Sequence, residues 1–229
     1  MILPVLFLIA TAVPNPATTT SDARTEYFRQ AASGSSRAAA IVAAFSLQAG
    51  DTGAALQWLP NAAESGDTES QLRLADMYVN GRGVLRDPKR AAHFYALAVN
   101  ESTEAQWKLG ALFQEGDGVP QNQEIAASMY RRAADKGYAD AQNSLATMYL
   151  TGLGVKQDFK EALKWYRKAA EQECADAQLN LASLYTQGVG VKQDFQAARS
   201  WAEKARRIKV HKAEELLAEI EKAQAEANE

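Results

Sequence analysis

Three kinds of side chain in this sequence could take part in chemistry: histidines, a cysteine and regularly spaced carboxylates. The two histidines, His93 and His211, lie more than a hundred positions apart, which makes them poor candidates for one metal site. Cys174 is the single cysteine, so an intrachain disulfide or a site with several cysteine ligands is excluded. With no histidine near it in sequence, Cys174 is better explained as a small structural residue than as a nucleophile. We expect no metal and no cofactor.

The carboxylates recur at one position of successive sequence segments. Asp87, Asp158 and Asp194 occupy this position, and Asn122 takes their place in one segment. A helix needs one such acceptor to cap its free N–H groups, whereas acid–base catalysis needs groups that lie together. Glu161, three residues after Asp158, further predicts a capping box. We expect helix caps and no catalytic constellation, so the chain is predicted not to be an enzyme.

A Gly-x-Gly-Val motif precedes each of these positions. Its four copies begin at Gly81, Gly116, Gly152 and Gly188. A phosphate-binding loop would follow a strand and continue into further glycines or Gly-Lys-Ser/Thr, neither of which occurs here. Glycine in the left-handed conformation closes a helix without a Cβ clash. Each motif is therefore predicted to end a helix.

The motifs belong to an internal repeat of about 36 residues. Its four copies occupy residues 67–103, 104–139, 140–175 and 176–211. In each copy, apolar residues spaced three and four apart predict one helix before the glycine motif and another after it. Trp165, Tyr166 and Trp201 lie on the second helices and are predicted to belong to the core.

Related segments flank the four copies. Residues 36–66 read as a divergent first helix pair that lacks the glycine motif. Residues 212–227 align with a first helix, carry a charged outer face and are expected to cap the array, as solenoids require. The sequence thus predicts an all-α fold, a single α-solenoid domain over residues 36–227.

The repeat reads Ala-Gln-x-x-Leu-(Ala/Gly)-x-(Met/Leu)-(Tyr/Phe)-x-x-Gly-x-Gly-Val-x-x-(Asp/Asn), which resembles the Sel-1-like repeat family, a branch of the tetratricopeptide-like helical repeats. Ser70 departs from the pattern in the first copy, and Met129 replaces an aromatic residue in the second. The resemblance implies a right-handed superhelix of antiparallel helix pairs that binds other proteins and has no common catalytic residue. One bacterial group with paired cysteines binds penicillin-like compounds, and this chain does not match it because Cys174 stands alone.

In stacked helix pairs the first helices line the concave side, so their variable positions form a candidate binding groove. We number each first helix from the glutamine of its Ala-Gln or Ser-Gln pair, which is position one. The second, sixth and ninth positions then share a helical face, at spacings of four and three. These positions hold Leu72, Asp76 and Val79; Trp107, Ala111 and Gln114; Asn143, Thr147 and Leu150; and Leu179, Ser183 and Thr186. Their mixed polar and apolar character suits a protein-binding surface, and a merely solvated face is the alternative.

Trp107 is expected to be the centre of this groove. It lies in a variable column where it has no obvious packing role, and large aromatic side chains dominate interface energies. Arg73 and Lys108 border the groove and are expected to favour an acidic partner segment.

The N-terminal stretch indicates export. Residues 2–13 are almost wholly apolar, too short for a membrane span of ~20 residues but typical of the centre of a secretory signal. Ala10-Thr11-Ala12 offers a cleavage site, although no Lys or Arg precedes the apolar run; a buried N-terminal helix is the alternative. We expect a signal peptide over residues 1–12, a linker and extension over 13–35, and a periplasmic or secreted bacterial protein.

The composition of the chain limits the classes of partner that it could bind. The apolar fraction of 47% and the net charge of -3 exclude a disordered chain, and a slightly acidic chain is a poor ligand for nucleic-acid phosphates. The sequence therefore predicts a monomeric, non-enzymatic exported adaptor that binds a protein or peptide in its groove. The alternative is a membrane-tethered envelope assembly factor with an uncleaved N-terminus. A third interpretation, a small-molecule-binding or hydrolytic repeat protein such as the penicillin-binding cysteine-rich group, is less favoured because this chain has a single cysteine.

Overall fold

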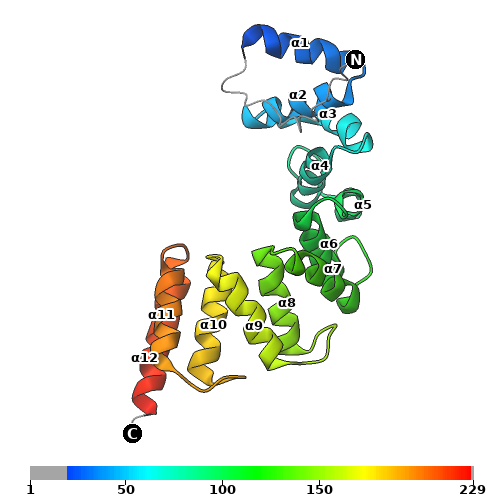
Figure 1. The fold of residues 1–229 in the computed structure, drawn as a ribbon. Helices are drawn as coiled ribbons and strands as arrows, with labels where there is room; N and C mark the ends of the chain where they lie inside the picture. Colours follow the sequence, from blue (N-terminus) through cyan, green and yellow to red (C-terminus); the bar gives the residue numbers. More distant parts are fainter. Residues whose placement is uncertain (1–19, 228–229) are drawn as a thin grey trace, which may run out of the picture. The chain divides into compact units, whose positions relative to one another are not determined.

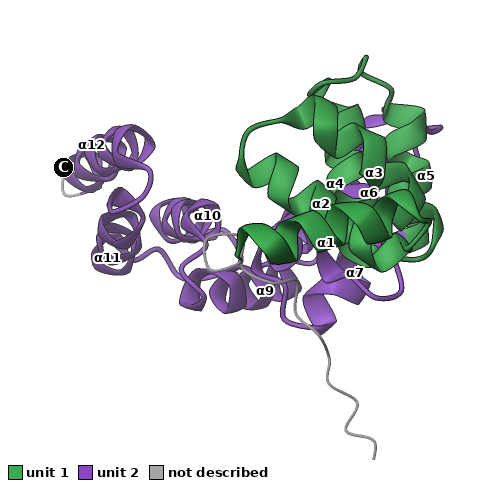
Figure 2. Ribbon diagram, turned by 90° about the horizontal axis from the view of Figure 1, so that it is seen from above, with its two compact units in different colours: residues 1–97 green, residues 98–229 purple. Residues whose placement is uncertain are grey.

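Residues 20–227 are described by the computed structural model, and all of their regular secondary structure is helical (Figure 1). The predicted signal peptide and its cleavage site lie outside the described residues. The chain divides into two compact units, residues 1–97 and 98–229, shown in separate colours in Figure 2.

The first unit contains helices α1 to α5. Their bounds are Ser21–Ala32, Ser36–Gln48, Thr52–Glu64, Thr68–Asn80 and Pro88–Ala98, the last of which ends at the unit boundary. Consecutive helices pack from α1 to α4, and Leu59, Leu74 and Met77 are buried between α3 and α4 together with small alanines. Helix α1 lies within the segment expected to be a linker and extension, so that segment is helical over Ser21–Ala32.

The second unit contains helices α6 to α12. Their bounds are Thr103–Glu115, Gln123–Asp135, Ala139–Thr151, Phe159–Glu171, Ala175–Gln187, Phe195–Arg206 and Val210–Glu226. Within each repeat of this unit the first helix packs on the second, and the second packs on the first helix of the next repeat. Helix α12, the expected capping helix, packs on α11 and also contacts α10.

The glycine motifs end the first helices, as predicted. Gly152, for example, is the C-cap of α8 in the left-handed conformation, with φ of 76°, and its N–H donates to Met148 O. Gly154 is also left-handed, with φ of 69°, and a Cβ atom added there would lie 2.1 Å from the carbonyl oxygen of Gln123. The second glycine of the motif is therefore required because the loop passes against the start of α7.

The predicted helix caps are also confirmed. The side chains of Asp87, Asn122, Asp158 and Asp194 each accept the N–H three residues later, at 2.9 to 3.1 Å. The prediction of a capping box at Asp158 is wrong. The Glu161 side chain points toward the later residues of the helix, where it accepts from Lys164 Nζ at 2.8 Å and Trp165 Nε1 at 3.1 Å. The N–H of Asp158 already donates to Tyr149 O at 2.9 Å, which leaves no donor for Glu161.

The aromatic side chains on the second helices differ in burial. Trp165 and Tyr166 are 3% and 1% exposed, so they belong to the core as predicted. Trp201 is half-buried and packs against the core of the second unit, so it lies at the edge of that core. Lys204 lies over its ring, with Nζ 3.8 Å from the ring centroid, and the ring also lines a surface cavity.

Candidate functional site

The candidate face lies on the first helices of the repeats, which are α4 in the first unit and α6, α8 and α10 in the second. In the second unit, side-chain hydrogen bonds connect these helices to one another. Trp107 Nε1 on α6 donates to Ser144 Oγ on α8 at 3.0 Å. One repeat later, Asn180 Nδ2 on α10 donates to Asn143 Oδ1 on α8, also at 3.0 Å. The two bonds join three first helices into one continuous layer.

Trp107 has a packing role, which corrects the expectation that it points outward without one. Its ring lies 5.8 Å from that of Tyr138, and it packs against the core of the second unit. The cause is the register between repeats, which sets the second position of one first helix against the third position of the next. Short polar residues at the third position, Ser144 and Asn180, are the sequence signal that could have identified this pairing.

The second-position column is therefore structural rather than open. Besides Trp107, Asn143 is bonded across to Asn180, and Leu179 is half-buried. In the first unit, Leu72 is buried. Trp107 and Asn143 bond across to the next first helix, whereas the sixth and ninth positions, which are also half-buried, are the part of the candidate face that remains.

Tyrosines from the second helices reach the sixth and ninth positions, a feature that the sequence analysis did not find. Tyr130 Oη donates to Gln114 Oε1 at 2.7 Å, and Tyr166 Oη shares a hydrogen bond of 2.8 Å with Thr147 Oγ1. In the first unit Tyr95 donates to Asp76. The signal was the recurrence of tyrosine at one position of three second helices.

The hydroxyls of Tyr130 and Tyr166 are neutral at physiological pH. Burial raises the pKa of Tyr130 above its ordinary value of 10.0, and the nearby Glu115 carboxylate raises it further. Burial likewise raises the pKa of Tyr166, although the bond to Thr147 opposes the shift. These hydroxyls can hold side chains in place but cannot act as bases.

In the second unit the face carries no charged side chain. Its sixth and ninth positions are all half-buried and hold Ala111, Gln114, Thr147, Leu150, Ser183 and Thr186. In the first unit, Val79 is half-buried beside Asp76. In the second unit, this mixture of amide, hydroxyl and aliphatic groups suits contacts to a neutral chain and includes no carboxylate, histidine or cysteine.

The two cations expected to border the groove are already paired. Arg73 forms a salt bridge with Glu69, and Lys108 Nζ lies 2.7 Å from Glu104 Oε1, each partner one turn earlier on the same helix. Their charges are offset locally, so the expected preference for an acidic partner loses its physical basis.

The remaining residues that could act in catalysis or metal binding do not gather at one place. His93 is exposed, and His211 faces Glu215 on the surface at 3.3 Å. Burial raises the pKa of the Cys174 thiol, and the carboxylates of Asp140 and Asp176 raise it further, which keeps the sulfur protonated. Among residues 20–227, no three histidine, cysteine or carboxylate side chains gather where they could hold a metal. None of the helices in this range is both long and apolar enough to cross a bilayer.

Solved structures with the same fold support the repeat assignment. A protective antigen of uropathogenic Escherichia coli with an SLR fold is 30% identical, with a TM-score of 0.74 over 80% of this chain and 40% of its own. This chain thus matches less than half the length of that antigen. A Sel1 repeat protein from Oxalobacter formigenes is 29% identical, with a TM-score of 0.74 over 81% of this chain and 79% of its own. No curated protein matches the chain.

The family comparison covers more than half of the chain. The Sel1 repeat matches four times, at residues 68–102, 103–138, 139–174 and 175–207. These matches coincide with the helix pairs, the glycine caps and the Asp or Asn caps described above. The chain belongs to the Sel1 repeat family.

Proposed function

We propose that this protein is a non-enzymatic adaptor that binds an extended, largely uncharged protein segment along the first helices of its second unit. Sel1 repeat proteins are typically protein-interaction scaffolds. The single observation that carries the proposal is the layer formed by α6, α8 and α10. It presents half-buried, uncharged side chains at equivalent positions of three successive repeats. An extended chain can be read by such a periodic surface, one repeat after another.

The side chains on this face are already held in place, which favours binding. Tyr130 fixes Gln114 and Tyr166 fixes Thr147, so these side chains lose less conformational entropy when a partner docks. Leu150 follows Thr147 by three residues on α8 and supplies apolar area. Trp107 supports the layer from α6 rather than serving as the main contact.

A charge placed on the face tests the proposal. Leu150→Asp should weaken binding of the native partner by about tenfold or more, because a carboxylate would be desolvated against an uncharged segment. Ser200→Asp is the matched control, since Ser200 is exposed on the second helix α11. The measurement is the dissociation constant by calorimetry, with circular dichroism of both variants. Equal affinities for the two variants would contradict the proposed face.

We further propose that the protein is exported and cleaved after Ala12. The support is the apolar run over residues 2–13 followed by small residues. Mass spectrometry of the protein from an envelope fraction should find a chain that begins at Val13. An intact Met1 on membrane-bound protein would instead favour the tethered assembly factor, and an intact Met1 in the cytosol would refute export.

A further inference from the structure

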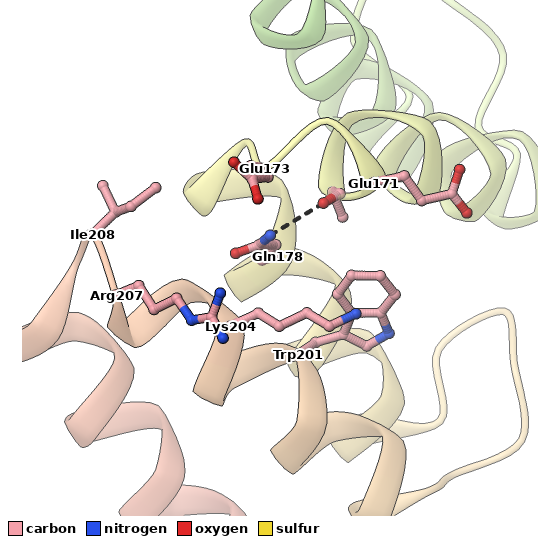
Figure 3. A pocket seen from close by; sticks show the side chains of 8 residues that line it. Glu171, Glu173, Gln178, Trp201, Lys204, Arg207 and Ile208 are labelled. Carbon is pink, nitrogen blue, oxygen red and sulfur yellow. Dashed lines mark hydrogen bonds between the residues drawn. The ribbon is translucent and has the colours of Figure 1, made fainter.

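A surface cavity of about 490 Å³ lies in the second unit, away from the first-helix face, between the end of α9, the start of α10 and the end of α11. Figure 3 shows side chains that line it. Glu171 and Glu173 come from the α9 side, and Trp201, Lys204 and Arg207 come from the α11 side. At its centre is Gln178, the glutamine of the Ala-Gln pair that begins the motif of the fourth repeat.

Gln178 lines this cavity, and its side chain contains an unsatisfied acceptor. Its residue is 4% exposed, and its Nε2 donates to Ala170 O at 3.1 Å, the dashed line in Figure 3. Its Oε1 is buried and has no hydrogen-bond partner within the described part of the chain. In Figure 3 this oxygen lies on the side of the amide that faces Arg207 and Ile208. A buried carbonyl without a donor is costly, so the site is poised to accept an N–H group.

The preceding repeat shows which group fits this position. There Gln142 makes the equivalent bond to Ala134 O at 3.1 Å, but its Oε1 accepts from Gln172 Nε2 at 2.7 Å. The same Gln172 Nε2 also donates to Lys168 O at 3.3 Å. A primary carboxamide with two N–H donors thus closes the site in the third repeat.

The fourth repeat lacks that carboxamide. The residue 36 positions after Gln172 is Ile208, which has no side-chain donor, while Lys204 lies 36 positions after Lys168 and retains its backbone carbonyl. In the second repeat Lys136 takes the same position, and there too the glutamine oxygen, Gln106 Oε1, has no partner among the described residues. Among the second, third and fourth repeats, the glutamine oxygen has a hydrogen-bond partner only in the third, where Gln172 lies at the end of the second helix.

The walls of the cavity favour a neutral ligand with a short aliphatic stem. Two carboxylates, on Glu171 and Glu173, stand against two cations, on Lys204 and Arg207, so neither sign of charge dominates. The half-buried ring of Trp201 provides an apolar wall for methylene groups.

We propose that this cavity binds the side chain of a glutamine residue presented by a peptide or protein partner. The incoming amide N–H groups donate to Gln178 Oε1 and to the backbone carbonyl of Lys204, as Gln172 does one repeat earlier. The proposal is independent of the first-helix face, since the cavity is lined from α9 and α11.

The test is a titration of the isotope-labelled full chain, followed by NMR, with N-acetyl-glutamine methylamide as the probe. The side-chain amide of Gln178 and the indole N–H of Trp201 should shift and saturate. The glutamate and alanine analogues should bind about tenfold more weakly or worse, since one lacks the N–H donors and the other lacks the stem as well. An absence of saturable shifts, or equal binding of the three probes, would overturn the proposal and leave a cavity filled by water alone.

A substitution taken from the third repeat provides the second arm. Ile208→Gln supplies the missing carboxamide from within the chain, so it should raise the melting temperature and lower the affinity for the glutamine probe by about tenfold. Ile208→Leu is the matched control and should bind as the wild type does. If Ile208→Gln bound the probe with unchanged affinity while circular dichroism showed a native fold, the assigned position would be wrong.

Discussion

The glutamine near the start of each first helix forms a hydrogen bond to the chain that precedes that helix. Gln71, Gln106, Gln142 and Gln178 each donate from Nε2 to a backbone carbonyl seven or eight residues earlier, at 2.7 to 3.1 Å. All four side chains are buried. The carbonyls of Ala63, Ala134 and Ala170 also accept a backbone N–H from three residues later, so each glutamine adds a side-chain bond to a helix end, and this arrangement returns with every repeat.

Gln142→Met tests this role at the residue scale. Methionine keeps the length of the side chain but cannot donate to Ala134 O or accept from Gln172, so we expect a loss of ~1–3 kcal/mol in the free energy of unfolding. Gln187→Met, at an exposed position, should change stability little. Urea denaturation measures both, and equal stabilities would show that the buried amide is dispensable.

Trp107→Ala should destabilise the protein, in contrast to the neutral effect that an outward tryptophan would give. The substitution removes the ring packed against Tyr138 and the donor to Ser144, for an expected cost of ~2–3 kcal/mol at this half-buried site. Trp107→Phe retains much of the ring and should lose about 1 kcal/mol. An unchanged melting temperature in Trp107→Ala would restore the outward interpretation.

At the scale of the elements, the start and end of each repeat helix depend on local residues. Each first helix ends at a glycine of the Gly-x-Gly motif, and each second helix begins after an Asp or Asn cap. These signals act within a few residues of the chain, which makes them strong predictors of where the helices lie.

Gly154→Val tests the loop between α8 and α9. The left-handed backbone disfavours a β-branched residue, and the added Cβ would overlap Gln123 O at the start of α7. We expect a loss of ~1–3 kcal/mol or more in the free energy of unfolding. Lys156→Ala, at an exposed position in the same loop, should be nearly neutral. Equal melting temperatures for the two variants would refute the turn assignment.

Contacts between elements were harder to predict than the elements themselves. The sequence showed the repeat, its helix pairs and its caps, because these follow from periodicity and turn chemistry. It did not show that Trp107 meets Ser144, that tyrosines of the second helices reach the candidate face, or that Trp201 borders a cavity. Each of these contacts depends on the register between helices, and a one-residue change in register would pair different side chains. Helix α1 was missed because its sequence, 21–32, lacks the repeat motif.

At the scale of the whole molecule, strong alkali should destabilise the fold. The pKa of Tyr130 and of Tyr166 is raised in the folded state, so the unfolded chain loses these protons first as pH increases. Their contribution to stability is complete below the unfolded value of 10.0 and declines as pH rises above it. Denaturation at pH 9 and pH 11 should show a lower free energy of unfolding at pH 11, with a smaller decline in Tyr130→Phe. An identical decline in that variant would remove Tyr130 from the explanation.

The central claim is that the first-helix face of the second unit holds the partner. Its most direct measurement is site-specific photocrosslinking in cells, with a photoreactive amino acid placed in turn at Leu150, Thr186 and, as the control, Ser128, which is exposed on the second helix α7. The account predicts crosslinks to the same partner protein from Leu150 and Thr186, which lie at equivalent ninth positions of α8 and α10, and none from Ser128. Crosslinks from Ser128 alone, or equal yields from all three positions, would contradict it.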